Sequence, residues 1–115
     1  MLDTEYVTQL LITHDWYRIG VHLSENHPND FELADLAKGL PIEPSTLRMY
    51  QNTASGIRPE WVRPDRPLGA FRQLLKVPIE VREAIVAEIE SHPEDEQDWR
   101  EYAICRRVIL HKRKR

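Results

Sequence analysis

Apolar residues recur three and four positions apart along most of the chain, and no stretch alternates apolar and polar residues with a period of two. The first spacing places apolar side chains on one face of a helix, whereas strict alternation is typical of strands. The pattern therefore predicts an all-helical protein. The predicted helices span approximately residues 4–13, 15–24, 31–39, 44–55, 68–75, 78–91 and 95–110.

Prolines divide this pattern into two parts. Pro59, Pro64 and Pro67 lie close together, and their missing amides and fixed backbone angles favour an extended connector over a helix. We therefore predict an N-terminal lobe at residues 1–57 and a Pro/Arg-rich connector at 58–67. A small C-terminal lobe of three helices with a basic tail is predicted at 68–115.

Composition limits the class of protein. The chain has 115 residues, 41% hydrophobic and 30% charged, which suits one ordinary domain or two small lobes. Its single cysteine, Cys105, cannot form an intrachain disulfide, and a reducing cytoplasm is the default compartment. Its apolar runs are too short for a membrane span, and the N-terminus lacks the pattern of a signal peptide. We therefore expect a soluble cytoplasmic protein with no membrane partner.

The net charge of −3 conceals strong local differences. Residues 1–30 carry −4 and residues 81–98 carry −6, whereas residues 45–76 carry +4 and residues 99–115 carry +6. The basic blocks are compatible with a nucleic-acid partner. Solvated helix faces that neutralise one another explain the same blocks equally well.

The most informative segment runs from Leu33 to Asn52 and has the spacing of two helices joined by a tight turn. A steep crossing of two helices over a turn of three or four residues needs a small residue and apolar residues on both sides. Those roles fall to Leu36-Ala37, Leu40, Ile42 and the run Ser45-Thr46-Leu47-Arg48-Met49-Tyr50. Through these residues the segment resembles bacterial and phage helix-turn-helix regulators of the immunity-repressor kind. It departs from them at Pro41, where glycine is usual, and at Glu43-Pro44.

The resemblance implies that the second helix enters the major groove of double-stranded DNA. Its candidate contact residues are Glu43, Ser45, Thr46, Arg48, Met49 and Asn52. Arg48 has the donors for a guanine edge, Asn52 suits an adenine edge, and Met49 suits a thymine methyl group. A pair of packed helices with a solvated polar face remains the alternative.

The C-terminal lobe carries a second resemblance. Leu68-Gly69-Ala70-Phe71-Arg72-Gln73-Leu74-Leu75, Pro78-Ile79-Glu80-Val81-Arg82-Glu83-Ala84 and Trp99-Arg100-Glu101-Tyr102 resemble the helical segment that follows the helix-turn-helix in ParB-type partition proteins. A plain three-helix packing unit fits the same spacing.

Basic residues outside the reading helix are further candidates for DNA contact. Arg58, Arg63 and Arg66 lie on the connector, where an extended basic segment suits phosphates or a minor groove, and Arg72 continues the same basic block. We expect Arg63 and Arg66 to be exposed. A simple tether explains the connector equally well, and a solubilising terminus explains the basic tail equally well.

Catalytic and metal sites are not indicated. The five histidines and one cysteine lack the paired spacing of zinc ligands, and no nucleophile motif or glycine-rich phosphate loop occurs. We therefore expect no enzyme activity, cofactor or metal.

The function that the resemblance implies is that of a sequence-specific DNA-binding transcription regulator, a prokaryotic or phage repressor. It would bind its operator as a monomer or homodimer in the cytoplasm of a bacterial host, at the nucleoid. The alternative is an adaptor or inhibitor that keeps the scaffold without reading DNA, which the acidic run Glu94-Asp95-Glu96-Gln97-Asp98 favours.

Overall fold

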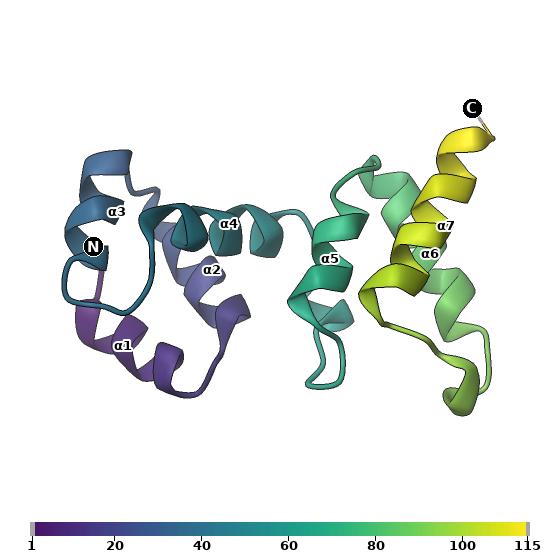
Figure 1. Cartoon of the computed structure of the whole chain (residues 1–115), viewed down its shortest axis with the longest axis horizontal. Helices are drawn as coiled ribbons and strands as arrows, with labels where there is room; N and C mark the ends of the chain where they lie inside the picture. The colour runs from purple at the N-terminus through teal and green to yellow at the C-terminus, as the bar shows by residue number, and fades with distance from the viewer. Residues whose placement is uncertain (1, 115) are drawn as a thin grey trace. The chain divides into compact units, whose positions relative to one another are not determined.

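The computed structural model describes residues 2–114 and contains only helical elements and loops within that range, which confirms the all-helical prediction. Seven α-helices and two short 3₁₀ turns follow one another along the described chain (Figure 1). The chain divides into two compact units, the first ending at Ser55 and the second beginning at Gly56. Each unit is described on its own below.

The first unit consists of four helices, and side chains cap the starts of the first three. The helices are α1 (Thr4–Ile12), α2 (Trp16–Asn26), α3 (Asp30–Ala37) and α4 (Pro44–Ser55). Asp3 and Asp15 accept hydrogen bonds from backbone amides at the starts of α1 and α2. Asn29 and Glu32 form a reciprocal capping box at α3. These local bonds satisfy amides that the first turn leaves without partners, and they set where each helix begins.

All four helices contribute to the core of the first unit, in which α2 packs against α1 and α4, and α3 packs against α4. The buried apolar side chains are Val7, Leu10, Ile19, Leu23, Leu33, Leu36, Ala37 and Leu47. Gly20 on α2 lies directly against the backbone of α4. A Cβ at this position would clash with the carbonyl oxygen of Tyr50 and lie 2.6 Å from the Cβ of Ala54. The two helices therefore approach closely because residue 20 has no side chain.

The connection between α3 and α4 is longer than predicted. α3 ends at Ala37 and α4 begins at Pro44, so residues 38–43 form a turn of six residues. Leu40 and Ile42 pack against the core from within this turn. Gly39 does not have a positive φ, and a Cβ there would meet nothing within 4 Å. The turn is therefore held by the packing of its apolar residues, and not by a glycine conformation.

The second unit contains three helices and two 3₁₀ turns. Its elements are η1 (Pro59–Trp61), α5 (Leu68–Leu74), α6 (Ile79–Glu90), η2 (Glu94–Glu96) and α7 (Glu101–Arg113). Both α5 and α6 pack against α7. Fully buried Phe71, Ile85 and Ile104 come from the three different helices. The apolar spacing along each helix thus has its predicted consequence, a shared core.

Two segments of the second unit differ from the prediction. Residues 58–67, predicted as an extended connector, include the turn η1 and bury Trp61 and Arg66 within this unit. The last helix begins at Glu101, not near residue 95. Pro93 precedes a 3₁₀ turn instead, and Trp99 is buried in the loop against Phe71, with ring centroids 5.5 Å apart. Burial of these large side chains outweighs the helical spacing of the sequence around them.

Candidate nucleic-acid interface

Four of the predicted contact residues lie along one side of α4: Ser45, Arg48, Met49 and Asn52. Their separations of three, four and seven positions place them on the same helix face. Ser45 and Asn52 are exposed, while Arg48 and Met49 are half-buried. The buried side chain of Leu47 belongs to the core on the opposite side of the helix. The first unit therefore presents a polar face of α4 to solvent.

Arg48 is already engaged within the first unit. Its guanidinium donates to the Asp30 carboxylate at 2.9 Å and to the Gln51 side-chain oxygen at 2.7 Å. Asp30 begins α3, and its side chain is fully exposed. The pair holds the guanidinium beside the outer face of α4, and it also neutralises part of the charge. Any anion or base edge that binds Arg48 competes with Asp30 for the same donors.

Glu43 and Thr46, the other two candidates on this segment, lie beside a different surface. Both line a groove of about 490 Å³ together with Leu11, His14, Pro41, Ile42 and Tyr50. Thr46 is half-buried there, and Glu43 is exposed just before α4 begins. Thr46 is two positions from Arg48, which places the two side chains about 160° apart around the helix. The structure therefore separates these two residues from the face that carries Arg48.

The four predicted arginines of the second unit have different surroundings. Arg63 and Arg72 are exposed and form no ion pair with another described residue. Arg58 is exposed but pairs with Glu83, and this hydrogen-bonded carboxylate raises the pKa of Arg58 above its ordinary value. Arg63 and Arg72 can therefore contact phosphates without losing an existing partner, whereas Arg58 would have to leave Glu83.

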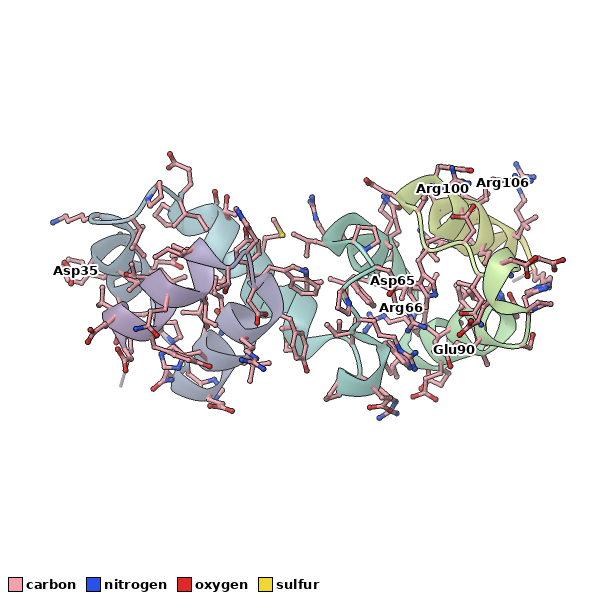
Figure 2. All side chains as sticks on the ribbon, turned by 90° about the horizontal axis from the view of Figure 1, so that it is seen from below. Asp35, Asp65, Arg66, Glu90, Arg100 and Arg106 are labelled. Atoms are coloured by element: carbon pink, nitrogen blue, oxygen red, sulfur yellow. The ribbon has the colours of Figure 1, made fainter. Side chains whose placement is uncertain are left out.

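The expected exposure of Arg66 is wrong. Its side chain is 3% exposed, donates to the Trp61 carbonyl oxygen at 2.8 Å and contacts Glu90 at 3.3 Å. Its guanidinium carbon lies 4.1 Å from the ring centre of Trp99. Figure 2 shows Arg66 and Glu90 together inside the second unit. Because the apolar stem and flat charged group stack on an indole, Arg66 is a packing residue and not a phosphate contact.

Sequence reasoning also missed a structural arginine, Arg82. This residue is one turn into α6, and it donates to the carbonyl oxygens of Leu74, Val77 and Gly56 at 2.7 to 3.0 Å. It thereby satisfies the carbonyl groups at the end of α5. The only sequence signal was an arginine shortly after Pro78, a position that indicates nothing about these partners.

The basic side chains that remain without an ion partner cluster in two parts of the second unit. Within residues 2–114, the exposed cations of this unit that form no ion pair are Arg63, Arg72, Lys76, Arg106, Lys112, Arg113 and Lys114. The last four lie along α7 and directly after it. Positive charge available to an anionic partner therefore lies in and beside α5 and along the second half of α7.

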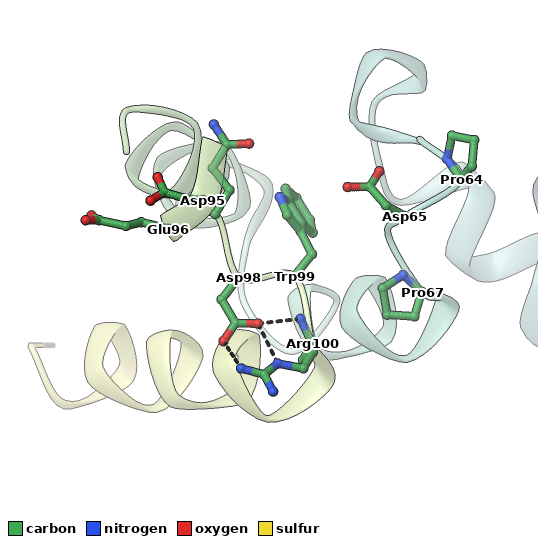
Figure 3. Close-up of a pocket in the computed structure, with 9 residues that line it drawn as sticks. Pro64, Asp65, Pro67, Asp95, Glu96, Asp98, Trp99 and Arg100 are labelled. Carbon is green, nitrogen blue, oxygen red and sulfur yellow. Dashed lines mark hydrogen bonds and ion pairs between the residues drawn. The ribbon is translucent and has the colours of Figure 1, made fainter. Parts of the chain in front are cut away.

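Acidic groups surround an open cleft of about 760 Å³ in the second unit. Its carboxylates are Asp65, Asp95, Glu96 and Asp98, and Trp99 forms part of its wall (Figure 3). Asp98 accepts hydrogen bonds from the Arg100 guanidinium and backbone amide, which lower the pKa of Asp98 to about 2. A cleft with this charge repels phosphates.

The first unit is acidic as a whole. Its charged residues are eight acids, Asp3, Glu5, Asp15, Glu25, Asp30, Glu32, Asp35 and Glu43, and three bases, Arg18, Lys38 and Arg48. The face of α4 is thus a small polar area, with a single cation, on a negatively charged unit.

Other kinds of site receive no support from the described residues. In residues 2–114, no group of three or more histidine, cysteine, aspartate or glutamate side chains is arranged to hold a metal ion. None of the helices in this range is long and apolar enough to span a membrane. No protein-family model, curated protein or solved structure matches the chain.

Proposed function

We propose that the chain is a sequence-specific double-stranded DNA-binding protein, a prokaryotic or phage transcription regulator of the repressor kind. The observation that carries the proposal is the outer face of α4, where Ser45, Arg48 and Asn52 point away from a core that α2 and α3 complete. In this proposal α3 and α4 act as a helix-turn-helix, and α4 enters the major groove.

The side chains on this face suit base edges of different kinds. A guanidinium such as that of Arg48 forms two hydrogen bonds with guanine, and the Asn52 amide pairs with adenine. Met49 lies between them on the helix and offers an apolar contact to a thymine methyl group. Because one α4 presents all three, the proposal assigns sequence preference to this helix.

Phosphate contacts in this proposal come mainly from the second unit. The first unit has few cations, whereas Arg63, Arg72 and Lys76 are exposed and have no ion partner among residues 2–114. Each phosphate contact changes the slope of log affinity against log salt by about one unit. DNA binding should therefore weaken steeply as salt is raised.

The test begins with selection from random-sequence DNA duplexes, because the operator is unknown. We expect the chain to enrich a defined motif, and Arg48→Ala to weaken binding to it by about 1 to 3 kcal/mol while leaving affinity for random DNA nearly unchanged. Arg18→Ala is the matched control, since Arg18 is an exposed arginine of the same unit that pairs with Asp15. Absence of any enriched motif contradicts the proposal.

A second candidate function is a protein-interaction adaptor that uses the same scaffold without DNA. The observation that favours it is the excess of acids in the first unit, together with the pairing of Arg48 with Asp30. Asp30→Asn separates the two functions. For a DNA-binding protein it frees Arg48 and removes a negative charge, so affinity should rise by about threefold to tenfold. An adaptor shows no such gain on DNA.

A further inference from the structure

The helix α7 carries large apolar side chains on its solvent side. Tyr102, Ile109 and Leu110 are 53%, 44% and 53% exposed, whereas Ile104 and Val108 on the opposite side are buried in the core. Positions 102, 106, 109 and 113 follow the alternating four- and three-residue spacing of a helix seam. The exposed stripe thus consists of two apolar patches, Tyr102 near the start of α7 and Ile109 with Leu110 nearer its end, with Arg106 between them.

We propose that this stripe pairs with the same stripe of a second copy of the chain, with the two α7 helices antiparallel. Tyr102 lies four residues before Arg106, and Leu110 lies four residues after it. An antiparallel pair centred on Arg106 places Tyr102 of one copy against Leu110 of the other, twice by symmetry. A surface that matches itself in this way is what a two-fold dimer requires.

The charges along α7 select the second copy as the occupant and fix the direction of pairing. Residues 94–101, which lead into the helix, carry five acids and one cation, Arg100, which pairs with Asp98 and stacks on Tyr102. Lys112, Arg113 and Lys114 lie at the other end of the helix. In an antiparallel pair the acidic start of one helix lies beside the basic end of the other, whereas parallel helices place like charges together. The tail of one copy then extends toward the acidic cleft beside Asp95 and Glu96 of the other.

Arg106 gives this interface a distinctive energetic signature. The residue is exposed and forms no ion pair with another described residue, and Figure 2 shows its side chain projecting outward from α7. At the centre of the antiparallel pair, the Arg106 side chains of the two copies lie close together and repel one another. The helix has 13 residues and is about 20 Å long, so the interface is small. We therefore expect a weak dimer that strengthens when Arg106 is replaced by an apolar residue.

The test measures the mass of the full chain by sedimentation equilibrium without DNA, from about 1 μM to about 1 mM. We expect a monomer–dimer equilibrium within this range. Ile109→Glu with Leu110→Glu should weaken dimerisation at least about tenfold, because carboxylates then replace the apolar contacts. Arg106→Leu should strengthen it at least about tenfold. Ile12→Glu, which changes an apolar residue 73% exposed on α1, should leave it unchanged.

The Ile12→Glu control distinguishes an interface on α7 from general stickiness, because any exposed apolar side chain contributes to general stickiness. Circular dichroism melting curves establish that each variant is folded. A chain that stays monomeric up to 1 mM, or an Arg106→Leu variant that does not dimerise more strongly, overturns the proposal. If the Ile109/Leu110 variant loses DNA affinity with no change in mass, α7 is a DNA surface and the dimer is likewise excluded. Because the mass is measured without DNA, failure here leaves the proposed function standing.

Discussion

Arg66 shows how a single charged side chain can belong to a core. It contacts a carbonyl oxygen, a carboxylate and an indole ring from three parts of the second unit. We predict that Arg66→Ala lowers the free energy of unfolding by about 1 to 3 kcal/mol, because packing on Trp99 and the hydrogen bond to Trp61 are both lost. Urea denaturation followed by circular dichroism measures this change.

Arg63→Ala is the matched control for that measurement. Arg63 is exposed three residues before Arg66 and forms no ion pair with another described residue, so its removal should change stability by less than about 0.5 kcal/mol. Equal losses for the two variants contradict the assignment of Arg66 to the core. The proposed function expects the reverse order for DNA binding, since the side chain of Arg63 is exposed and that of Arg66 is buried.

Asp98 makes a contribution to stability that depends on pH. Hydrogen bonds from Arg100 hold the pKa of Asp98 at about 2, below its ordinary value of 3.8. Since the pKa is lower in the folded state, this stabilisation is fully present above pH 3.8 and is lost as the pH falls toward 2. Both side chains are partly exposed, so the effect is small.

Asp98→Asn tests this pH dependence. We predict that the variant is less stable than the parent at pH 7 and that the difference disappears as the pH approaches 2, as measured by urea denaturation across that range. Asp95→Asn is the control, because Asp95 is exposed and accepts no hydrogen bond from a described residue. A difference that stays constant with pH contradicts the role of the Asp98 carboxylate.

At the scale of helices, the approach of α2 to α4 depends on Gly20. We predict that Gly20→Ala destabilises the protein by about 1 to 3 kcal/mol, because the added methyl group forces apart two helices that hold the core of the first unit. Thermal unfolding followed by circular dichroism measures the loss. Under the proposed function, the same variant should also weaken sequence-specific DNA binding, since it displaces the helix that carries Arg48.

Gly39→Ala is the corresponding control in the turn before α4. A methyl group there meets no atom within 4 Å, and the backbone does not have a positive φ. Its melting temperature should therefore equal that of the parent or lie slightly above it. A loss as large as that of Gly20→Ala would mean that the turn, and not the helix contact, sets the position of α4.

At the scale of the whole molecule, the boundary after Ser55 predicts an independently folding C-terminal part. Fully buried Phe71, Ile85 and Ile104 all come from the second unit. Arg82 donates a hydrogen bond to the carbonyl oxygen of Gly56, which is the first residue of this unit. We predict that a chain beginning at Gly56 is helical and unfolds cooperatively on heating, with reduced stability because a domain of about 60 residues buries little surface. A broad, non-cooperative transition in circular dichroism contradicts this.

The amino-acid sequence alone determined the helices and the outer face of α4. Helix formation depends on side chains three and four positions apart and on caps within the first turn, and both are visible in the sequence. The predicted bounds of α4 agree with the structure for this reason. Ser45, Arg48 and Asn52 share one face of α4, whereas Glu43 and Thr46, predicted with them, lie beside a different groove. Sequence reasoning had no comparable local signal for the start of α7.

Only the tertiary structure decided which charged side chains are free. Arg48 pairs with Asp30, 18 residues away, and Arg66 pairs with Glu90, 24 residues away. The start of α7 was likewise decided by burial of Trp99 against Phe71. Contacts between residues so far apart leave no periodic trace in the sequence, because they depend on how folded helices pack. The sequence therefore identified where the arginines are, whereas their partners and exposure depended on the packed core.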